Sequence, residues 1–460
     1  MKLILKNCAL FSILCFSLFT VLDGNAQTWV NVGSPGFSAG PATYTSIAID
    51  TGGTPYVVYQ DATVNSAATV MKYNGSSWVN VGNPGFSTAQ VASTAIAIDR
   101  SGTPCVVYQE NDYAGPATVM KYNGSSWVPL GSPGFSIDEA AYTSIAIDGN
   151  GTQYIIYGDY TIAGQATVMK YNGSSWVTVG NANFSAGMVD FPIITIDRSG
   201  TPYVVYDDYG NGQKATVMKY NGSSWVNVGN PGFSAGEVGW TSIAIDSSGM
   251  PYVVYMDYSN GQKANVMRYN GSSWINIGSP GFSVGAAYCT NIILDASGTP
   301  YVVYGDGGNS HKATVMKYNG SSWVNAGNTG FSSAGAEWTS MALDKKGTLY
   351  VAFIDRGNNG KATVMKLDTA IHTEVKNVNS FFTTLTVFPD PNNGSFTLNI
   401  SSPAKEEATI TITNMLGEKV KELTATTNTE TQIQLDCPPG VYFISAVTMQ
   451  GKQSGKVVVW

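Results

Sequence analysis

The sequence predicts an all-β protein, a seven-bladed β-propeller with four-stranded blades, followed by a small β-sandwich. Three observations favour the propeller. The motif YNGSSW occurs six times, and its Trp recurs every 49 residues. An additional Trp29 lies one more period upstream, and the last repeat lacks the strand that such a Trp would begin. A period of about 40 to 50 residues with short strands is typical of propeller blades.

The chain begins with a segment that is typical of a secretory signal peptide, residues 1–26. Two lysines precede an apolar run over residues 9–22, and small residues lead to a cleavage site expected after Ala26. The run is shorter than the roughly 20 apolar residues of a membrane-spanning helix. A lipoprotein signal is disfavoured because Leu14, rather than a small residue, precedes Cys15. We therefore expect export and no integral membrane segment in the mature protein.

Each repeat predicts two hairpins in series. In the repeat over residues 241–278, strands are expected at 242–245, 252–255, 265–269 and 274–277. The sequence DSSG supplies the turn of the first hairpin. The Asn-Gly pair of YNGSSW supplies the second, because Asn and Gly accept the positive backbone angles of a tight turn. One repeat therefore provides one four-stranded sheet.

The ends of the repeat region predict a closed ring. The first strands of the seven units are expected to begin at Thr45, Thr94, Thr143, Pro192, Thr241, Thr290 and Thr339. The seventh unit has a third strand at Ala362–Leu367, but a polar segment stands where its Trp strand is due. The strand at Trp29–Gly33 is in excess at the other end. If these two strands pair, the last blade is complete and two sheet edges are covered. An open solenoid gives no reason why the repeat region begins with one extra strand and ends with one strand missing.

A family resemblance supports this strand order. The segment IAIDSSGMPYVVYMD is similar to the repeats of NHL-type and related bacterial propellers, and the resemblance covers Trp29–Leu367. It implies that the first strand of each blade is the innermost one. That family includes enzymes, scaffolds and receptors, so the function has to be inferred from the site.

A second domain follows the propeller, which we place at residues 27–367. A linker is expected at 368–384 and a compact β-sandwich at 385–460, where alternating strands are broken by Pro-Asn-Asn-Gly, Leu-Gly-Glu and Pro-Pro-Gly turns. This domain resembles the type A C-terminal sorting domain of type IX secretion cargo from the Bacteroidetes. The matching blocks are FPDP at 388–391, MLGEKV at 415–420, GVYF at 440–443 and the terminal strand 456–460, with Asp390 where Asn is commoner.

The resemblance implies how the protein is exported. The signal peptide would carry the chain across the inner membrane, and the type IX secretion machinery would recognise residues 385–460 and carry it across the outer membrane. We therefore expect a protein that is secreted or displayed on the outer-membrane surface. The alternative is that the second domain is a structural accessory.

Composition excludes several function classes. The net charge is -7 and no basic tract occurs, so nucleic acid is not an expected partner. The two histidines, His311 and His372, cannot supply a Ser-His-Asp arrangement or a histidine metal site. After signal removal, Cys105, Cys289 and Cys437 suggest neither a disulfide framework nor a metal knuckle. We expect no catalytic set, no metal and no cofactor.

Candidate ligand-binding residues stand just before each expected innermost strand. Five of the seven are aromatic: Tyr44, Ser93, Tyr142, Phe191, Trp240, Cys289 and Trp338, with Tyr288 beside the cysteine. On a propeller they approach the channel mouth, where aromatic faces suit sugar rings or apolar side chains. The alternative is that they pack between blades.

A ring of acids is the second candidate feature. An acid ends each second strand, at Asp61, Glu110, Asp159, Asp208, Asp257, Asp306 and Asp355. These side chains either cap the following loop or contact a ligand. A lysine follows six residues later in the last four blades, and we include Asp208, Asp257 and Asp306 among the candidate ligand residues.

The sequence therefore predicts a binding protein for a carbohydrate or surface polymer rather than an enzyme. One alternative is a glycoside hydrolase or lyase that uses rim carboxylates. A glycosidase needs two acids separated by about 5 to 10 Å, and no pair of rim acids stands apart from its equivalents in the other repeats. The other alternative is a purely structural surface protein.

Overall fold

The computed structural model describes residues 27–111, 115–136, 139–368, 384–402, 404–448 and 451–460. The expected signal peptide and residues 369–383 of the expected linker lie outside these ranges. The chain divides into two compact units, Met1–Ile371 and His372–Trp460. Within the described ranges, no helix is long and apolar enough to cross a membrane.

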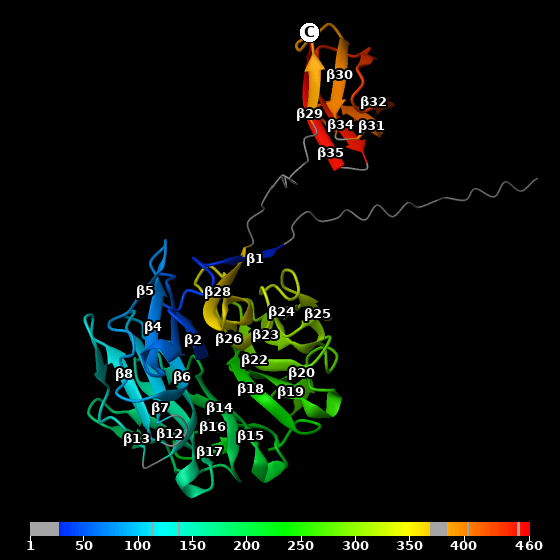
Figure 1. The fold of residues 1–460 in the computed structure, drawn as a ribbon. Coiled ribbons are helices and arrows are strands. Elements are labelled where there is room, and N and C mark those ends of the chain that lie inside the picture. Colours follow the sequence, from blue (N-terminus) through cyan, green and yellow to red (C-terminus); the bar gives the residue numbers. More distant parts are fainter. Residues whose placement is uncertain (1–26, 112–114, 137–138, 369–383, 403, 449–450) are drawn as a thin grey trace, which may run out of the picture. The chain divides into compact units, whose positions relative to one another are not determined.

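The first unit is a ring of seven four-stranded antiparallel sheets, which confirms the predicted seven-bladed propeller (Figure 1). The first blade contains β2 (Ala42–Ile49), β3 (Pro55–Asp61), β4 (Ala67–Tyr73) and β5 (Trp78–Asn80), hydrogen-bonded in that order. The next two contain β6 (Val91–Ile98), β7 (Pro104–Glu110), β8 (Ala117–Tyr122) and β9 (Trp127–Pro129), then β10 (Ala140–Ile147), β11 (Gln153–Asp159), β12 (Gln165–Tyr171) and β13 (Trp176–Thr178).

The remaining blades repeat this order. Blade four contains β14 (Val189–Ile196), β15 (Pro202–Asp208), β16 (Lys214–Tyr220) and β17 (Trp225–Asn227); blade five contains β18 (Val238–Ile245), β19 (Pro251–Asp257), β20 (Lys263–Tyr269) and β21 (Trp274–Asn276). Blade six contains β22 (Ala287–Leu294), β23 (Pro300–Asp306), β24 (Lys312–Tyr318) and β25 (Trp323–Asn325). Among the residues that the structure describes, short 3-10 helices follow six of the second strands: η1 (Ala62–Val64), η2 (Tyr160–Ile162), η3 (Tyr209–Asn211), η4 (Tyr258–Asn260), η5 (Gly307–Asn309) and η6 (Arg356–Asn358).

The N-terminal strand closes the ring. Blade seven contains β26 (Ala336–Leu343), β27 (Leu349–Asp355), β28 (Lys361–Asp368) and, as its outermost strand, β1 (Thr28–Asn31). Trp29 lies opposite Leu367 in the antiparallel ladder. Figure 1 shows the blue β1 beside the yellow β28. The predicted closure by an early strand is therefore confirmed.

The tryptophan of each outermost strand joins two neighbouring blades. The Trp78 indole nitrogen donates to the carbonyl oxygen of Val32 at 2.7 Å, and its ring stacks on Phe37 with centroids 4.1 Å apart. Gly33, at φ 71°, has no side chain, and a Cβ there would lie only 3.1 Å from the Trp78 indole. The corresponding bonds are Trp127 to Val81, Trp176 to Leu130, Trp225 to Val179, Trp274 to Val228 and Trp323 to Ile277. Trp29 completes the series by donating to Ala326 at 2.8 Å.

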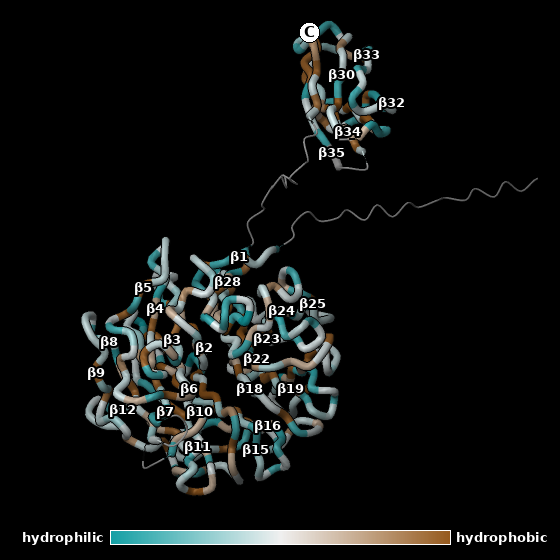
Figure 2. The backbone as a smooth tube through the Cα atoms, in the orientation of Figure 1, coloured by the Kyte–Doolittle hydropathy of each residue, from teal (hydrophilic) through white to brown (hydrophobic). Residues whose placement is uncertain are grey.

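The hydrophobic core lies between the blades. Each sheet has a neighbour on both faces, so the second strands are apolar on both sides. Val57 and Val58 of β3, which point to opposite faces, are both fully buried. Val57 packs towards Val364 of blade seven, and Val58 towards Val106 of blade two. Figure 2 shows hydrophobic stretches along the strands around the centre of the ring.

The second unit is the predicted β-sandwich. One sheet has the order β29 (Thr384–Phe388), β30 (Ser395–Ser401), β33 (Thr431–Gln434), and the other has the order β32 (Lys419–Thr426), β31 (Glu407–Thr413), β34 (Gly440–Thr448), β35 (Gly451–Val459). Both sheets contribute to one core, with Phe396 and Leu398 from the first and Ile410, Ile444 and Val457 from the second.

Candidate ligand site at the mouth of the central channel

A β-bulge interrupts the innermost strand of every blade at the same position. In β2, Thr43 pairs with Gln60, and pairing resumes only at Ser46, opposite Val58. Tyr44 lies within the bulge and has a φ of 52°, which non-glycine residues seldom adopt. The same conformation, with φ between 46° and 56°, occurs at Ser93, Tyr142, Phe191, Trp240, Cys289 and Trp338.

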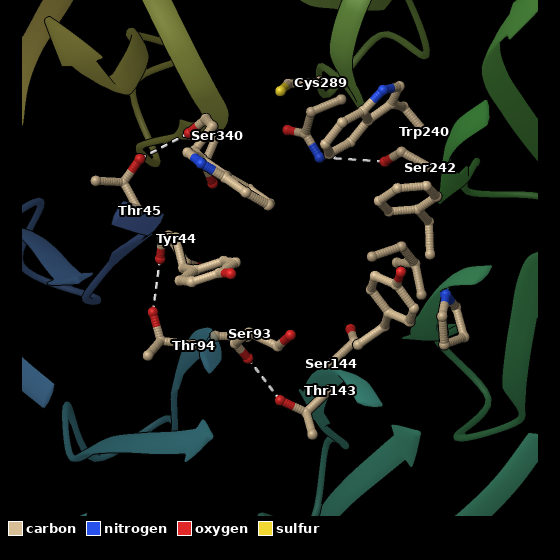
Figure 3. A pocket seen from close by; sticks show the side chains of 18 of the residues that line it. Tyr44, Thr45, Ser93, Thr94, Thr143, Ser144, Trp240, Ser242, Cys289 and Ser340 are labelled. Atoms are coloured by element: carbon tan, nitrogen blue, oxygen red, sulfur yellow. Dashed lines mark hydrogen bonds between the residues drawn. The ribbon is translucent and has the colours of Figure 1, made fainter. Parts of the chain in front are cut away.

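The bulge changes where the candidate residues sit. The sequence predicted them just before the innermost strand, whereas the structure places them inside it. The reason is that the two residues before each bulge already pair with the end of the second strand, as Ala42 does with Asp61. A bulge redirects the strand, and Figure 3 shows the bulge residues surrounding an open centre.

Threonine hydroxyls hold the bulges in place. A left-handed conformation costs a non-glycine residue roughly 1–2 kcal/mol, so the surrounding structure must fix it. Thr94 donates to the carbonyl of Tyr44 in the preceding blade at 2.6 Å, and Thr339 donates to that of Cys289 at 2.6 Å. The same bond starts from Thr45, Thr143, Thr241 and Thr290, and Pro192 replaces threonine in blade four.

The bulges surround a cavity of about 310 Å³ on the axis of the ring (Figure 3). Five aromatic rings form a continuous series around it: Tyr142 contacts Phe191 (centroids 5.0 Å apart), Phe191 contacts Trp240 (4.3 Å), Trp240 contacts Trp338 (5.5 Å) and Trp338 contacts Tyr44 (4.4 Å). The structure thus brings these five predicted residues into one site. The five rings contact one another across blades and also line the cavity. Packing between blades and contact with a ligand are therefore compatible roles for them.

Hydroxyl and amide groups line the rest of the cavity. The two or three residues after each bulge contribute them, among them Ser46, Ser144, Ser242, Asn291 and Ser340. Some of these also bond to the neighbouring blade, as in the Asn291 amide of blade six, which donates to Ser242 of blade five at 3.1 Å. The cavity therefore combines aromatic faces with hydrogen-bonding groups.

Tyr288 lies outside this cavity. Its ring packs against His311 with centroids 5.1 Å apart, and its hydroxyl donates to the Gln262 side-chain oxygen at 3.3 Å. Its neighbour Cys289 takes the bulge position and lines the cavity instead. Ligand contact by Tyr288 stays a prediction.

The acids Asp208, Asp257 and Asp306 also lie outside the cavity lining, and each is at most 3% exposed. The three carboxylates bond to the loop that follows them. Asp257 accepts from the amide of Ser259 at 3.1 Å, Asp306 accepts from the amide of Gly308 at 3.0 Å, and Asp208 accepts from the side-chain amide of Asn211 at 2.8 Å. These contacts are those of loop caps, and ligand contact by the three acids stays a prediction.

A pair of carboxylates in blade four was not predicted. Asp190 and Asp207 lie directly opposite each other in the β14–β15 ladder, next to the bulge of Phe191. The hydroxyls of Tyr160 and Tyr209 donate to Asp190 at 3.2 and 2.9 Å. Burial and the charge of Asp190 raise the pKa of both tyrosines, so both remain hydrogen-bond donors at neutral pH.

Asp207 is fully buried, and neither of its oxygens has a hydrogen-bond partner among the described residues. Burial raises its pKa well above the usual range, and the charge of Asp190 adds to this shift. The hydroxyl and amide of Thr241 lie close enough to lower the pKa in part, although neither reaches hydrogen-bond geometry. A signal was present in the sequence, because Asp207 is the one acid among its equivalents Gln60, Gln109, Gly158, Met256, Gly305 and Ile354.

Replacing Asp207 by methionine is expected to stabilise the protein. Met256 fills the equivalent place in blade five and is 2% exposed, so the space accepts this side chain. A buried carboxyl without a partner costs roughly 1–3 kcal/mol, and we expect Asp207→Met to recover about that amount near neutral pH.

The pH dependence of this gain follows from the raised pKa. The unfolded chain loses the Asp207 proton at the ordinary pKa and the folded chain only at higher pH, so the penalty on folding grows as pH rises between the two values. Urea unfolding should therefore show a larger gain from Asp207→Met at about pH 7.5 than at about pH 4. An equal gain at both, or a loss of stability, would contradict this assignment.

The face of the propeller that carries this mouth is acidic. We call it the loop face; it contains the connections between second and third strands and those that lead to the next blade. Its described acids are Asp61, Glu110, Glu139, Asp159, Asp190, Asp207, Asp208, Glu237, Asp257, Asp306, Glu337 and Asp355, and its cations are Lys214, Lys263, Lys312, Lys361 and Arg356. In the described part of the chain, no three His, Cys, Asp or Glu side chains are grouped as a metal site.

Comparison with known families identifies the C-terminal unit. Residues 386–460 match the family model described as "Secretion system C-terminal sorting domain". This unit is a type IX sorting domain. It indicates that the protein is exported to the cell surface or secreted, with the type IX machinery as the partner of the sorting domain.

Comparison with solved structures concerns the propeller. An ulvan lyase, described as a new family of polysaccharide lyase, has 15% identity and a TM-score of 0.48, over 72% of this chain and 94% of that one. An α-L-arabinanase from Penicillium chrysogenum has 12% identity and a TM-score of 0.44, over 74% and 98%. A lectin from Aleuria aurantia has 16% identity and a TM-score of 0.42, over 61% and 94%. No curated protein sequence matches the chain.

Proposed function

We propose that this exported protein binds a neutral carbohydrate chain at the mouth of the propeller channel. The observation that supports the proposal is the series of five aromatic rings around a cavity of about 310 Å³. All five occupy left-handed positions that cost stability. Backbone strain of this kind clusters at ligand sites and active sites.

The chemistry of the cavity suits a sugar. Aromatic faces offer large rigid surfaces to the apolar face of a pyranose ring, and nearby hydroxyl and amide groups can satisfy its hydroxyls. The volume is at the lower end of the roughly 300–1,000 Å³ range for small-molecule sites. The cavity therefore suits a short terminal segment of a glycan better than a long internal stretch.

Charge favours a neutral ligand. The loop face carries more acids than cations among the described residues, and Asp190 lies directly beside Phe191 of the cavity. A uronic acid or a sulfated sugar would meet an unfavourable potential there, because like charges across a binding surface weaken association. A neutral glycan avoids this cost.

A second candidate function is cleavage of the bound glycan. The observation that favours it is the opposed pair Asp190 and Asp207 beside the cavity. Asp207 has no exposed carboxylate oxygen, so direct attack on a substrate would require blade four to move. An assay for reducing ends or unsaturated products with bound glycans tests this function, and Asp190→Asn should abolish any activity found.

A glycan array with residues 27–460 tests the proposed function. We expect binding at the channel mouth to a limited set of neutral glycans, and this binding should weaken when Trp240 or Trp338 is replaced. The result that contradicts the proposal is an array without specific binding, which would leave a structural surface protein as the better interpretation.

A further inference from the structure

The opposite face of the propeller carries a repeated cationic feature. We call it the turn face; it contains the Asp-x-x-Gly turns and the Asn-Gly-Ser-Ser turns, at residues 50–54 and 74–77 in blade one. A Lys or Arg lies at the turn-face end of every third strand, in all seven blades: Lys72, Lys121, Lys170, Lys219, Arg268, Lys317 and Lys366.

Three of these cations lie over a tyrosine ring on the second strand of their own blade. The ladder pairs Lys72 with Tyr56, Lys219 with Tyr203 and Arg268 with Tyr252. The cationic groups lie 5.8, 5.9 and 5.3 Å from the centres of the tyrosine rings. Contact with an aromatic face stabilises a cation without neutralising it, so these groups keep their charge.

Most of these cations have no carboxylate partner in the part of the chain that the structure describes. Lys121 and Arg268 lie 3.3 and 3.4 Å from Asp99 and Asp246. In the other five blades no described carboxylate oxygen comes within 4.0 Å of the cation. The aspartate of the turn is engaged with backbone amides in those blades, as Asp50 is with the amides of Gly52 and Thr54.

The two faces of the propeller therefore differ in the sign of their charge. The turn face has the cations Lys72, Arg100, Lys121, Lys170, Arg198, Lys219, Arg268, Lys317, Lys345, Lys346 and Lys366 against the acids Asp50, Asp99, Asp148, Asp197, Asp246, Asp295, Asp344 and Asp368. The loop face has more acids than cations. An anionic polymer is attracted to one face and repelled by the other, although the whole chain carries a net charge of -7.

Grooves between neighbouring blades give this face a shape that fits a ligand. One groove of about 510 Å³ lies between Tyr56 and Lys72 of blade one and Lys121 and Tyr122 of blade two. The junction of blades five and six has one of about 510 Å³ with Arg268 and Lys317, and that of blades seven and one has one of about 550 Å³ with Lys366 and Lys72. Each contains two cations, tyrosine side chains and turn backbone.

We propose that the turn face binds an acidic polysaccharide, whose carboxylates or sulfates meet the cations of successive grooves. The tyrosines supply apolar contact for the sugar rings between the charges. Because the grooves repeat from blade to blade, several weak contacts along one polymer add to a high avidity. DNA fits less well, because its phosphates are denser than one cation per blade and the protein lacks a basic tract. This site is distinct from the channel mouth and does not depend on it.

The test is binding of residues 27–460 to polygalacturonate, with pullulan as a neutral polymer and a single-stranded 30-nucleotide DNA beside it. We expect binding to polygalacturonate that weakens about tenfold or more between roughly 50 and 200 mM NaCl, whereas any binding of the neutral pullulan should not weaken with salt. Equal or tighter binding to the DNA, or no binding to polygalacturonate, would overturn the proposal.

Matched variants locate the site. Lys219, Lys317 and Lys366 lie on the turn face, whereas Lys214, Lys312 and Lys361 lie on the loop face of the same strands, β16, β24 and β28. Replacing the first three by glutamine should weaken polygalacturonate binding about tenfold or more, and replacing the second three should change it by less than about twofold. Equal losses in both triple variants would show non-specific charge attraction and overturn the proposal.

A measurement on the unmodified chain keeps the test independent of variant folding. Lysine acetylation read by mass spectrometry should slow at Lys219, Lys317 and Lys366 when polygalacturonate is added. Acetylation at Lys214, Lys312 and Lys361 should not change. Protection of the second set alone, or of both sets alike, contradicts the proposed face.

Discussion

Replacement of Trp29 by alanine is expected to lower the free energy of unfolding by about 3–5 kcal/mol, the usual cost of removing a large buried aromatic side chain. Trp29 is 7% exposed, stacks on Phe331 with centroids 4.2 Å apart and donates to the Ala326 carbonyl. It is also the side chain through which β1 joins blade six to blade seven. Urea unfolding followed by circular dichroism measures the loss.

Thr28→Ala is the matched control, because Thr28 lies in the same strand and its side chain is exposed. We expect a change within about 0.5 kcal/mol for it. If Trp29→Ala and Thr28→Ala had the same small effect, β1 would not be packed on the ring in solution.

Loss of glycan binding is the second large expected effect. Trp240 and Trp338 touch each other across the cavity with centroids 5.5 Å apart, so both should contact the same ligand. Serine is a suitable replacement because Ser93 occupies the equivalent bulge of blade two with nearly the same backbone angle, φ 51°. We expect Trp240→Ser and Trp338→Ser each to weaken the best neutral glycan by roughly 30-fold, equivalent to about 2 kcal/mol.

Calorimetric titration with the strongest array ligand measures this effect. Val284→Ala serves as the control, because Val284 is a 74% exposed apolar side chain outside the cavity lining, and its variant should bind as the unmodified protein does. Unchanged affinity in both tryptophan variants would place the glycan elsewhere and contradict the proposed site.

The fold was predictable because its evidence is periodic. The Trp spacing of 49 residues and the excess strand at Trp29 fix both the number of blades and the closure. The turn at Asn-Gly-Ser-Ser depends on local sequence, so it can be predicted from any single repeat. In Asn74, for example, the side-chain oxygen accepts the amides of Ser76 and Ser77, as the turn interpretation requires.

The candidate site was only partly predictable. The ring of positions at Tyr44 and its equivalents followed from the repeat, but their left-handed conformation did not, because a bulky aromatic residue normally avoids it. It is imposed by long-range pairing and by hydroxyls from the next blade, such as Thr94. Asp207 was missed for a similar reason: its burial depends on three-dimensional packing, although its uniqueness among the repeats was visible.

The charge difference between the two faces shows a further limit of composition. The net charge of -7 and the lack of a basic tract argued against nucleic acid as a partner. Once the strand order is known, Lys214 and Lys219, which are five residues apart on β16, belong to opposite faces. Composition gives only the net charge of the whole chain, whereas the strand order assigns each charged residue to one face.

Ring closure by β1 is the claim on which both sites depend, and an engineered disulfide tests it directly. Val30 and Lys366 are paired across the β1–β28 ladder, and Val79 and Lys72 are paired in the same way within blade one. Facing residues in an antiparallel ladder have a spacing that is compatible with a disulfide. In a background without Cys105, Cys289 and Cys437, the pair Val30→Cys with Lys366→Cys should oxidise as completely as the pair Val79→Cys with Lys72→Cys. A third variant, Val30→Cys with Lys72→Cys, tests whether β1 pairs with blade one instead. Ring closure is contradicted if the first pair stays reduced while this third pair forms a disulfide.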